Sequence, residues 1–265
     1  MIIFSHRANG YGFLENSRNA IQHALASDVD GIEIDLRLTK DNHYVVCHDA
    51  YLDRVSRGTG LLRKKTAAQL QKERLLDGQG LLFFNEFLQL LQTSNKQCII
   101  ELKDNGQEQE VITQLKKHHL LKQCFLASWN PHALEKIRHL STQAQTLLYY
   151  VPVPRFLRFI TLSRKKMFDG DEVTIGLNTF SAMRPQDFTV LLSSYVPQLS
   201  CNGIGIPHVA IQPHVIKACK TRGLHLITYA VNNTSTYTRL RALGLYGVIS
   251  DRPRSLYAAR SGDSM

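Results

Sequence analysis

The sequence has few cysteines and no pattern that would join them. Its five cysteines are scattered, mostly among apolar neighbours, and no two stand in a Cys-x-x-Cys spacing. This excludes a disulfide-stabilised scaffold and the common structural zinc sites. We therefore expect buried, reduced thiols.

Long hydrophobic runs are also missing. No stretch of about 18 apolar residues occurs, so the sequence predicts no transmembrane helix. The first ten residues, MIIFSHRANG, lack the charged start and the small-residue cleavage site of a secretory signal. Both absences favour a cytoplasmic protein.

Acidic residues are outnumbered by basic ones. The chain has 22 Asp and Glu against 32 Lys and Arg, a formal net charge of +10, which favours anionic partners: phosphates, nucleic acids or acidic membrane surfaces. Zinc-finger spacing, RNA-binding aromatic motifs and glycine-rich phosphate loops are absent, so we expect no nucleic-acid partner. Phosphorylated small molecules and anionic membranes are therefore the expected partners.

What the chain does contain is an alternation of short β-branched apolar runs with helical patterns. The expected strands are 2–5, 31–36, 45–47, 99–102, 124–128, 146–150, 173–177, 203–206, 225–230 and 247–250. The expected helices are 17–26, 85–92, 108–118, 132–140, 185–194, 213–222 and 235–243. Repeated βα units predict parallel strands, and about eight of them favour a single (β/α)₈ TIM barrel over residues 1–265.

Two stretches interrupt the repeat. Residues 49–80 predict a flap-like insertion after the second strand, beside the rim of the barrel. Residues 151–171, after the fifth strand, interleave phenylalanines with arginines and lysines. This segment is read either as an interfacial helix that makes peripheral contact with an anionic membrane or as an ordinary helix with one wet basic face.

Carboxylates stand inside one of the predicted core strands. In GIEIDLRL, Glu33 and Asp35 alternate with Ile32 and Ile34, so both acids lie side by side on the opposite face. Two like charges that close repel each other unless a cation lies between them. The spacing therefore predicts a bound cation.

Reactive residues of such barrels lie at the carboxyl ends of the strands, and these ends are unusually polar here. Carboxylates of Glu33, Asp35 and Glu101 suit Mg²⁺ or Ca²⁺. Nearby basic groups would bind a phosphate, and two imidazoles would exchange the protons of a phosphodiester cleavage. The basic groups are those of Arg7 and Lys103, and the imidazoles those of His6 and His48.

These motifs, in this order, resemble the glycerophosphodiester phosphodiesterase family over nearly the whole chain. The family has His-Arg-Gly, Pro-Glu-Asn-Thr, Glu-x-Asp, His-Asp and Glu-x-Lys, followed by a Trp-Thr-Val-Asn strand and a closing Gly-Ile-x-Thr-Asp-x-Pro. The matching segments are His6-Arg7-Ala8, Leu14-Glu15-Asn16-Ser17, Glu33-Ile34-Asp35, His48-Asp49, Glu101-Leu102-Lys103, Thr228-Tyr229-Ala230-Val231-Asn232 and GVISDRP at 247–253.

The resemblance implies a (β/α)₈ barrel that hydrolyses glycerophosphodiesters to an alcohol and glycerol 3-phosphate with a divalent cation, Mg²⁺ or Ca²⁺. It implies His6 and His48 as the acid/base pair. The other roles that it implies are metal ligands at Glu33, Asp35 and Glu101, phosphate binding at Arg7 and Lys103, and a supporting acid at Glu15.

Three departures from the family pattern concern the pocket. Ala8 replaces the usual glycine, and Asn9-Gly10 is expected to take over the tight turn. Tyr229 stands where a pocket tryptophan is usual, and Trp129 stands beside the place of a common phenylalanine. Both aromatic residues are expected to bind substrate.

Several alternatives stay open at this point. A lysophospholipase D-type enzyme would act on membrane lysophospholipids, and the basic aromatic segment would support it. A cyclic phosphate as the first product is a mechanistic variant. A catalytically inactive barrel that binds a phosphorylated headgroup is the alternative from another class. The alcohol released and the oligomeric state are not indicated by the sequence.

Overall fold

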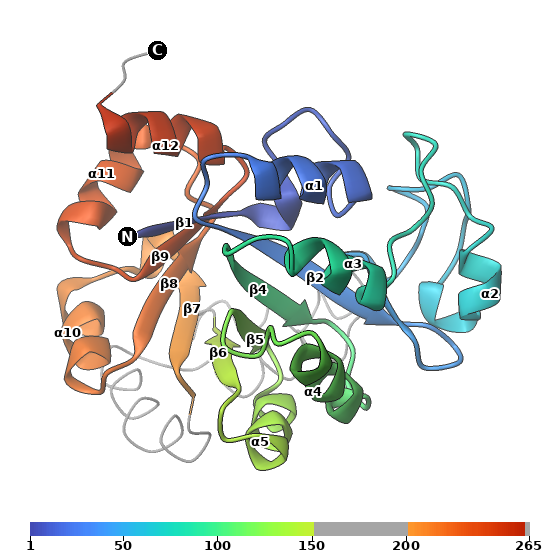
Figure 1. The fold of residues 1–265 in the computed structure, drawn as a ribbon. Coiled ribbons are helices and arrows are strands. Elements are labelled where there is room, and N and C mark those ends of the chain that lie inside the picture. The colour runs from blue at the N-terminus through green and yellow to red at the C-terminus, as the bar shows by residue number, and fades with distance from the viewer. Residues whose placement is uncertain (151–200, 263–265) are drawn as a thin grey trace, which may run out of the picture.

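The computed structural model describes residues 1–150 and 201–262, and their strands form a closed barrel (Figure 1). The strands are β1 (Ile2–Ser5), β2 (Gly31–Leu38), β3 (Tyr44–Val46), β4 (Gln97–Leu102), β5 (Cys124–Ser128), β6 (Gln145–Tyr149), β7 (Gly203–Pro207), β8 (His225–Tyr229) and β9 (Gly247–Ser250). All except β3 run parallel in the order β1-β2-β4-β5-β6-β7-β8-β9, and pairing of β9 with β1 closes the ring. The predicted TIM barrel is confirmed.

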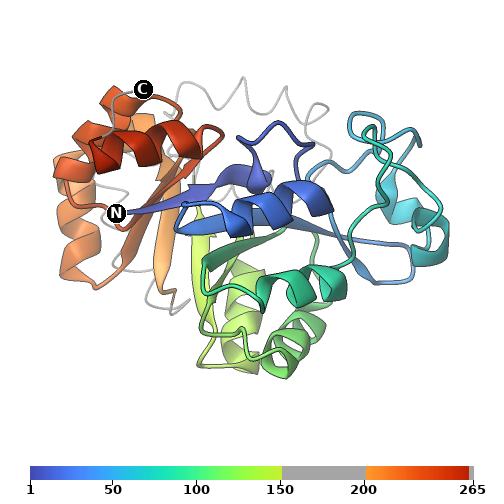
Figure 2. The same cartoon turned by 45° about the horizontal axis from the view of Figure 1, so that its top comes forward.

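Helices cover the outside of the barrel (Figures 1 and 2). The covering helices are α1 (Arg18–Ala26), α3 (Phe84–Leu91), α4 (Glu108–Lys117), α5 (Pro131–Leu140), α10 (Pro213–Thr221), α11 (Thr234–Ala242) and α12 (Pro253–Ser261). The short helix α2 (Ala67–Leu70) lies beside the barrel (Figure 1), and the 3₁₀ turns are η1 (His6–Ala8), η2 (Leu62–Lys64) and η6 (His208–Ala210). Ser17 caps α1 by accepting from the Ala20 N–H, and Asn130 caps α5 through the His132 N–H. Gly223 and Gly244 end their helices with positive φ.

One predicted strand belongs to a different arrangement. The run at 45–47 was predicted as a strand without a direction, and β3 pairs antiparallel to β2, with Leu36 opposite Val46 and Leu38 opposite Tyr44. A short hairpin turn between two runs favours antiparallel pairing, because a parallel pair needs a long crossover. The predicted strand 173–177, the predicted helix 185–194 and the segment 151–171 lie outside the described residues.

The residues between β3 and α3 form a small unit beside the barrel, at the end of the sheet where β2 extends (Figures 1 and 2). This insertion, residues 49–80, packs with residues of β3 and its flanks in a hydrophobic cluster separate from the barrel core. The cluster comprises Val45, Cys47, Leu52, Val55, Leu62, Leu70, Leu75 and Leu81. Its small core makes the insertion a packed support for the neighbouring rim.

The barrel has two apolar layers, one between strands and helices and one inside the lumen. The lumen layer is filled by Phe4, Ile99, Phe125, Ala127, Leu147, Tyr149, Ile227 and Ile249. Glycines make room for the Phe4 ring: a Cβ at Gly31 would lie 2.6 Å from the Phe4 side chain, and one at Gly247 would lie 2.9 Å from it. The lumen below the rim is therefore a closed apolar floor.

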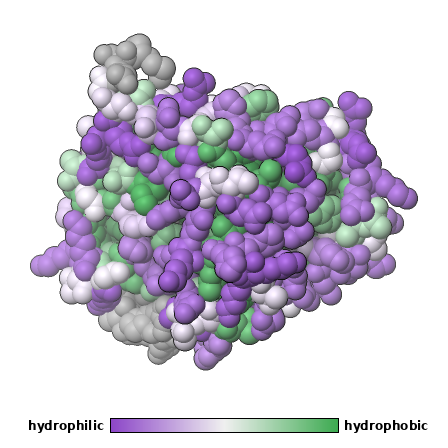
Figure 3. All heavy atoms as spheres, in the orientation of Figure 1, coloured by the Kyte–Doolittle hydropathy of each residue, from purple (hydrophilic) through white to green (hydrophobic). Residues whose placement is uncertain are grey.

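The cysteines and the surface can be compared with the predictions from the sequence. The five cysteines are free and buried, as predicted. The face shown in Figure 3 is mainly hydrophilic, with hydrophobic residues in separate patches. Among residues 1–150 and 201–262, no helix combines the length and the hydrophobicity needed to span a bilayer.

Candidate active site

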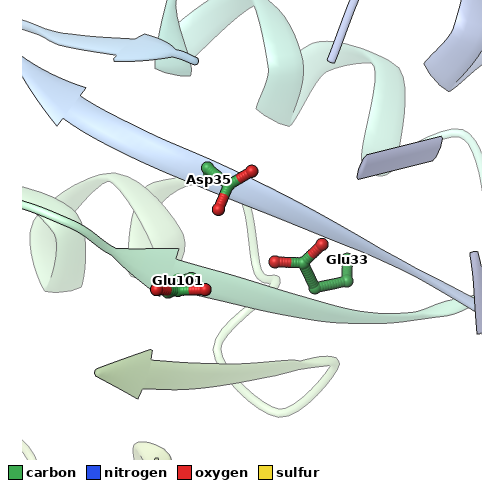
Figure 4. A group of neighbouring side chains, drawn as sticks. All are labelled: Glu33, Asp35 and Glu101. Atoms are coloured by element: carbon green, nitrogen blue, oxygen red, sulfur yellow. The ribbon is translucent and has the colours of Figure 1, made fainter. Parts of the chain in front are cut away.

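Strand β2 directs two carboxylates into the lumen. Ile32 and Ile34 face the outer layer under the helices, so Glu33 and Asp35 face inward, as the alternation of a strand requires. Strand β4 lies beside β2 in a register that pairs Asp35 with Glu101. The three acids consequently converge from two neighbouring strands (Figure 4).

The three carboxylates are close together and buried. Each offers one oxygen within 4.8 Å of the others, and none is more than 6% exposed. Burial above the apolar floor, together with the Asp35 carboxylate, raises the pKa of Glu33 to about 8. Among residues 1–150 and 201–262, Glu33 accepts one backbone hydrogen bond, from the Arg7 N–H at 2.9 Å. Burial and mutual repulsion therefore oppose ionisation of all three acids together, and a cation between them would favour it.

Two basic side chains neutralise part of this charge. Lys103 Nζ lies 2.6 Å from Glu101 Oε1 and 3.2 Å from Asp35 Oδ1, and Arg7 Nε lies 3.5 Å from Asp35 Oδ2. Although burial opposes the shift, Lys103 and the other nearby cations hold the pKa of Asp35 well below its usual range. Asp35 Oδ1 nevertheless makes no hydrogen bond with a described residue. This oxygen is ion-paired with Lys103 and can still accept a further ligand.

These observations fit a hard divalent cation. All three donors are carboxylate oxygens, the ligands that Mg²⁺ and Ca²⁺ prefer. A double positive charge would stabilise the ionised form of Glu33 and meet the open lone pairs of Asp35. Residues Glu33, Asp35 and Glu101 would hold the ion.

One imidazole is built into the barrel. His6 follows β1, and its Nδ1 lies 2.6 Å from Asp251 Oδ1 at the end of β9. Asn232 donates to the second oxygen of Asp251, at 2.8 Å. Burial alone would lower the pKa of His6, but the hydrogen bond to Asp251 and the charge of Glu33 outweigh it and raise this pKa. In return, the hydrogen bond from His6 lowers the pKa of Asp251 to about 2.

The second imidazole approaches from the hairpin. Since β3 runs antiparallel to β2, the chain after it returns towards the acids, and the Cys47 N–H donates to the Asp35 carbonyl at 3.0 Å. This return places His48 at the rim, with its Nδ1 2.6 Å from Asp49 Oδ1. Burial and the positive charge of Lys103 lower the pKa of His48.

Arg7 sits in a turn of uncommon backbone conformation. Arg7 and Ala8 have φ of 51° and 56°, in the left-handed region that non-glycine residues avoid. Asn9-Gly10 was expected to take over the tight turn; Gly10 does adopt positive φ, but Ala8 does so as well. The Arg7 side chain is held by Glu15, whose Oε1 accepts a hydrogen bond from Arg7 Nη1 at 3.0 Å. Glu15 supports Arg7 and is not one of the three clustered acids.

An aromatic wall stands next to the acids. The Trp129 ring lies 5.5 Å from that of Tyr149 and 6.2 Å from that of Tyr229, between ring centres. Trp129 Nε1 donates to Glu101 at 3.0 Å, which ties the wall to the carboxylate cluster. The Tyr229 hydroxyl is buried and makes no hydrogen bond with a described residue, so burial raises its pKa.

The structure thus brings all ten predicted site residues to one end of the lumen. Sequence reasoning did not assign a role to Asp49, Asp251, Asn16 or Arg54. The first two directly follow His48 and the last strand, a position that could have indicated them. Asn16 lies inside a recognised motif, and its side chain donates to Asp35 at 2.9 Å. Arg54 has no comparable signal, because only folding brings it to the site.

A family model matches most of the chain. The model described as "Glycerophosphoryl diester phosphodiesterase family" matches residues 6–255. A curated relative, the glycerophosphodiester phosphodiesterase of Caldanaerobacter subterraneus subsp. tengcongensis, is 21% identical over 267 residues, covering 96% of each chain. The sequence similarity therefore spans the whole barrel.

Solved structures have the same fold. A glycerophosphodiester phosphodiesterase from Agrobacterium tumefaciens superposes with a TM-score of 0.75 at 20% identity, covering 99% of this chain and 100% of the other. A phosphodiesterase from Oleispira antarctica, in complex with the product sn-glycerol-3-phosphate, gives a TM-score of 0.74 at 20% identity over 98% and 97% of the chains. With its family model matched nearly end to end, the chain belongs to the glycerophosphoryl diester phosphodiesterase family of phosphoric diester hydrolases.

Proposed function

We propose that this protein hydrolyses glycerophosphodiesters to an alcohol and glycerol 3-phosphate, using a divalent cation, Mg²⁺ or Ca²⁺, and the imidazoles of His6 and His48. The observation that carries the proposal is a cluster of three buried carboxylates at the same end of the lumen as two imidazoles, each held by an aspartate. Family membership and the product complex of the Oleispira antarctica protein support the same reaction.

The basic residues are proposed to bind the phosphate. Arg7 and Lys103 lie within 4 Å of Asp35, so their charge is concentrated where the acids converge. A cation bound by the acids supplies further charge stabilisation to the phosphate oxygens as negative charge develops. Arg7 and Lys103 orient the phosphate beside it and hold it near both imidazoles.

The two imidazoles are suited to move protons. In each, Nδ1 is engaged by an aspartate at 2.6 Å, which fixes the orientation of the ring and leaves Nε2 for the reaction. One imidazole takes the proton of the attacking water, and the other protonates the leaving alkoxide. The carboxylates of Asp251 and Asp49 stabilise whichever ring is protonated.

The aromatic wall is proposed to bind the organic part of the substrate. Trp129 and Tyr229 cover the lumen next to Glu101, with Tyr149 behind them. Flat rings bury the carbon skeleton of a glycerol or alcohol group, and the Trp129 indole is held in place by its hydrogen bond to Glu101.

The test follows the products of glycerophosphocholine by phosphorus NMR, with Mg²⁺, with Ca²⁺ and after EDTA treatment. We expect the glycerol 3-phosphate signal to replace that of the diester, with choline released as the phosphorus-free alcohol, no turnover after EDTA, and recovery when either metal is restored. An Asp35→Asn variant should not recover, because a neutral amide is a poorer ligand for a hard cation.

The same assay, run with glycerophosphocholine and with lysophosphatidylcholine, separates the alternative reactions. A cyclic phosphate as the first product would replace the hydrolytic mechanism by attack of a substrate hydroxyl. Clear preference for lysophosphatidylcholine over glycerophosphocholine would assign the enzyme to membrane lipids. No turnover of either compound with any metal would contradict the proposed function.

A further inference from the structure

Arg54 joins the insertion to two different parts of the rim. Its Nε lies 2.5 Å from Asp49 Oδ2, and its Nη2 lies 2.5 Å from Glu15 Oε1. Asp49 follows the hairpin, whereas Glu15 belongs to the loop between β1 and α1, 39 positions from Arg54 along the chain. A single guanidinium therefore bridges two loops that meet only in the folded protein.

Both carboxylates that Arg54 binds hold a residue of the proposed site. Glu15 Oε1 also accepts from Arg7 Nη1 at 3.0 Å, and Asp49 Oδ1 lies 2.6 Å from His48 Nδ1. The contacts run from Arg7 through Glu15, Arg54 and Asp49 to His48. The phosphate-binding arginine and one imidazole are thus connected by one chain of charge-assisted hydrogen bonds.

An exposed ion pair by itself would carry little weight, because solvent screens most surface pairs. This one differs in two respects. The partner carboxylates are partly buried, with side-chain exposures of 13% for Glu15 and 25% for Asp49 against 50% for Arg54. The planar guanidinium also engages both of them at once, a geometry that a single ammonium group does not reproduce.

We propose that Arg54 is a positioning residue: it fixes Glu15 and Asp49, and through them the orientations of Arg7 and His48. This role rests on the proposed function. It makes the 49–80 insertion part of the catalytic apparatus, since its packed core holds the backbone from which Arg54 reaches the rim. His6 is held by Asp251 and Asn232 and does not depend on Arg54.

The first experiment compares Arg54→Ala, Arg54→Lys and Arg63→Ala in the full-length protein, with glycerophosphocholine and a divalent cation. Arg63 is a matched control, because it is an exposed arginine of the same insertion that makes no hydrogen bond or ion pair with a described residue. We expect Arg54→Ala to lower kcat by about 10- to 100-fold, the usual effect of losing a group that orients a site residue. Arg54→Lys should retain most of this loss.

Chemical rescue distinguishes positioning from simple stability. The Arg54 side chain is half exposed, so free guanidinium can enter the space left by truncation. Millimolar guanidinium chloride should restore part of the kcat of Arg54→Ala and leave wild type and Arg63→Ala unchanged. An unaltered kcat in Arg54→Ala would overturn the proposal, as would a loss that guanidinium does not reverse and that parallels a lower melting temperature.

A readout without turnover separates this proposal from the function on which it rests. In nitrogen-15 spectra of the histidine side chains, Arg54→Ala should shift the His48 signals and leave those of His6 in place. This result would stand even if wild type did not cleave glycerophosphocholine. Unchanged His48 signals would overturn the positioning role, whatever the activity.

Discussion

The two imidazoles of the site have the same local geometry and different supports. His6 and His48 each place Nδ1 2.6 Å from an aspartate oxygen. The aspartate of His6 ends a barrel strand and is fixed by Asn232, whereas the aspartate of His48 is fixed by Arg54 from the insertion. One side of the site is therefore built by the barrel and the other by an addition to it.

The surroundings of His6 and His48 also differ in the charges near each ring and in backbone conformation. Glu33 lies near His6 and helps to raise its pKa, while Lys103 near His48 helps to lower the pKa of that ring. The barrel side contains the left-handed residues Arg7 and Ala8; within residues 49–80, the positive φ angles belong to glycines. The charge that distinguishes the two imidazoles thus comes from barrel residues, whereas the contact of Arg54 with Asp49 comes from the insertion.

The largest expected effect is on kcat, and it tests whether the reaction needs both His6 and His48. Replacing His6 or His48 by alanine should each lower kcat by about 10²- to 10⁴-fold, because each removes one proton-transfer group. Steady-state kinetics on glycerophosphocholine would measure the loss. His139→Ala is the control, since this exposed histidine lies on α5 away from the rim. If only one of the two substitutions reduced kcat, the two-imidazole mechanism would be wrong.

A moderate effect concerns titration. In cation-free protein, His6 should titrate above the ordinary histidine pKa of about 6.5 and His48 below it. Asp251→Asn should lower the pKa of His6 alone, and Asp49→Asn that of His48 alone, because each removes a negative partner. Proton NMR of the ring signals would follow both. Titration in the reverse order would contradict the electrostatic difference.

The pKa shifts of His6 and His48 make the stability of the folded protein depend on pH in opposite directions. Because the folded-state pKa of His6 is raised, this group stabilises the protein below about pH 6.5, and the contribution is lost as the pH rises through the folded pKa. For His48, whose folded-state pKa is lowered, the fold favours the neutral ring, so stability falls as the pH drops below about 6.5.

The smallest expected effect is on the free energy of unfolding, and it compares a left-handed turn of the insertion with one of the barrel. Gly60 of the insertion has φ +85° with open space around its Cβ position, so Gly60→Ala should lower the free energy of unfolding by about 1 kcal/mol. Ala8 already bears this cost on the barrel side. Ala8→Gly should change stability less, because relief of the backbone offsets the loss of a buried methyl worth about 0.8 kcal/mol. Urea denaturation would measure both; equal losses would argue against a left-handed Ala8.

Much of the fold and of the site could be predicted from local patterns. Alternation placed Glu33 and Asp35 on one face, and the two-residue spacing placed Lys103 beside Glu101, where Nζ and Oε1 are 2.6 Å apart. The direction of β3 was not predicted, because an apolar run of this length pairs in either direction. The segment 151–171 is outside the described residues, so its two interpretations remain predictions.

The sequence by itself determined the alternation of strands and helices, the faces on which the acids lie, and the order of the motifs, since these depend on neighbours within a few residues. Only the tertiary structure decided that Asp251 meets His6 across 245 positions and that Arg54 bridges Glu15 and Asp49. Barrel closure and the insertion's own core create these contacts, and pairings over such separations leave no period in the sequence.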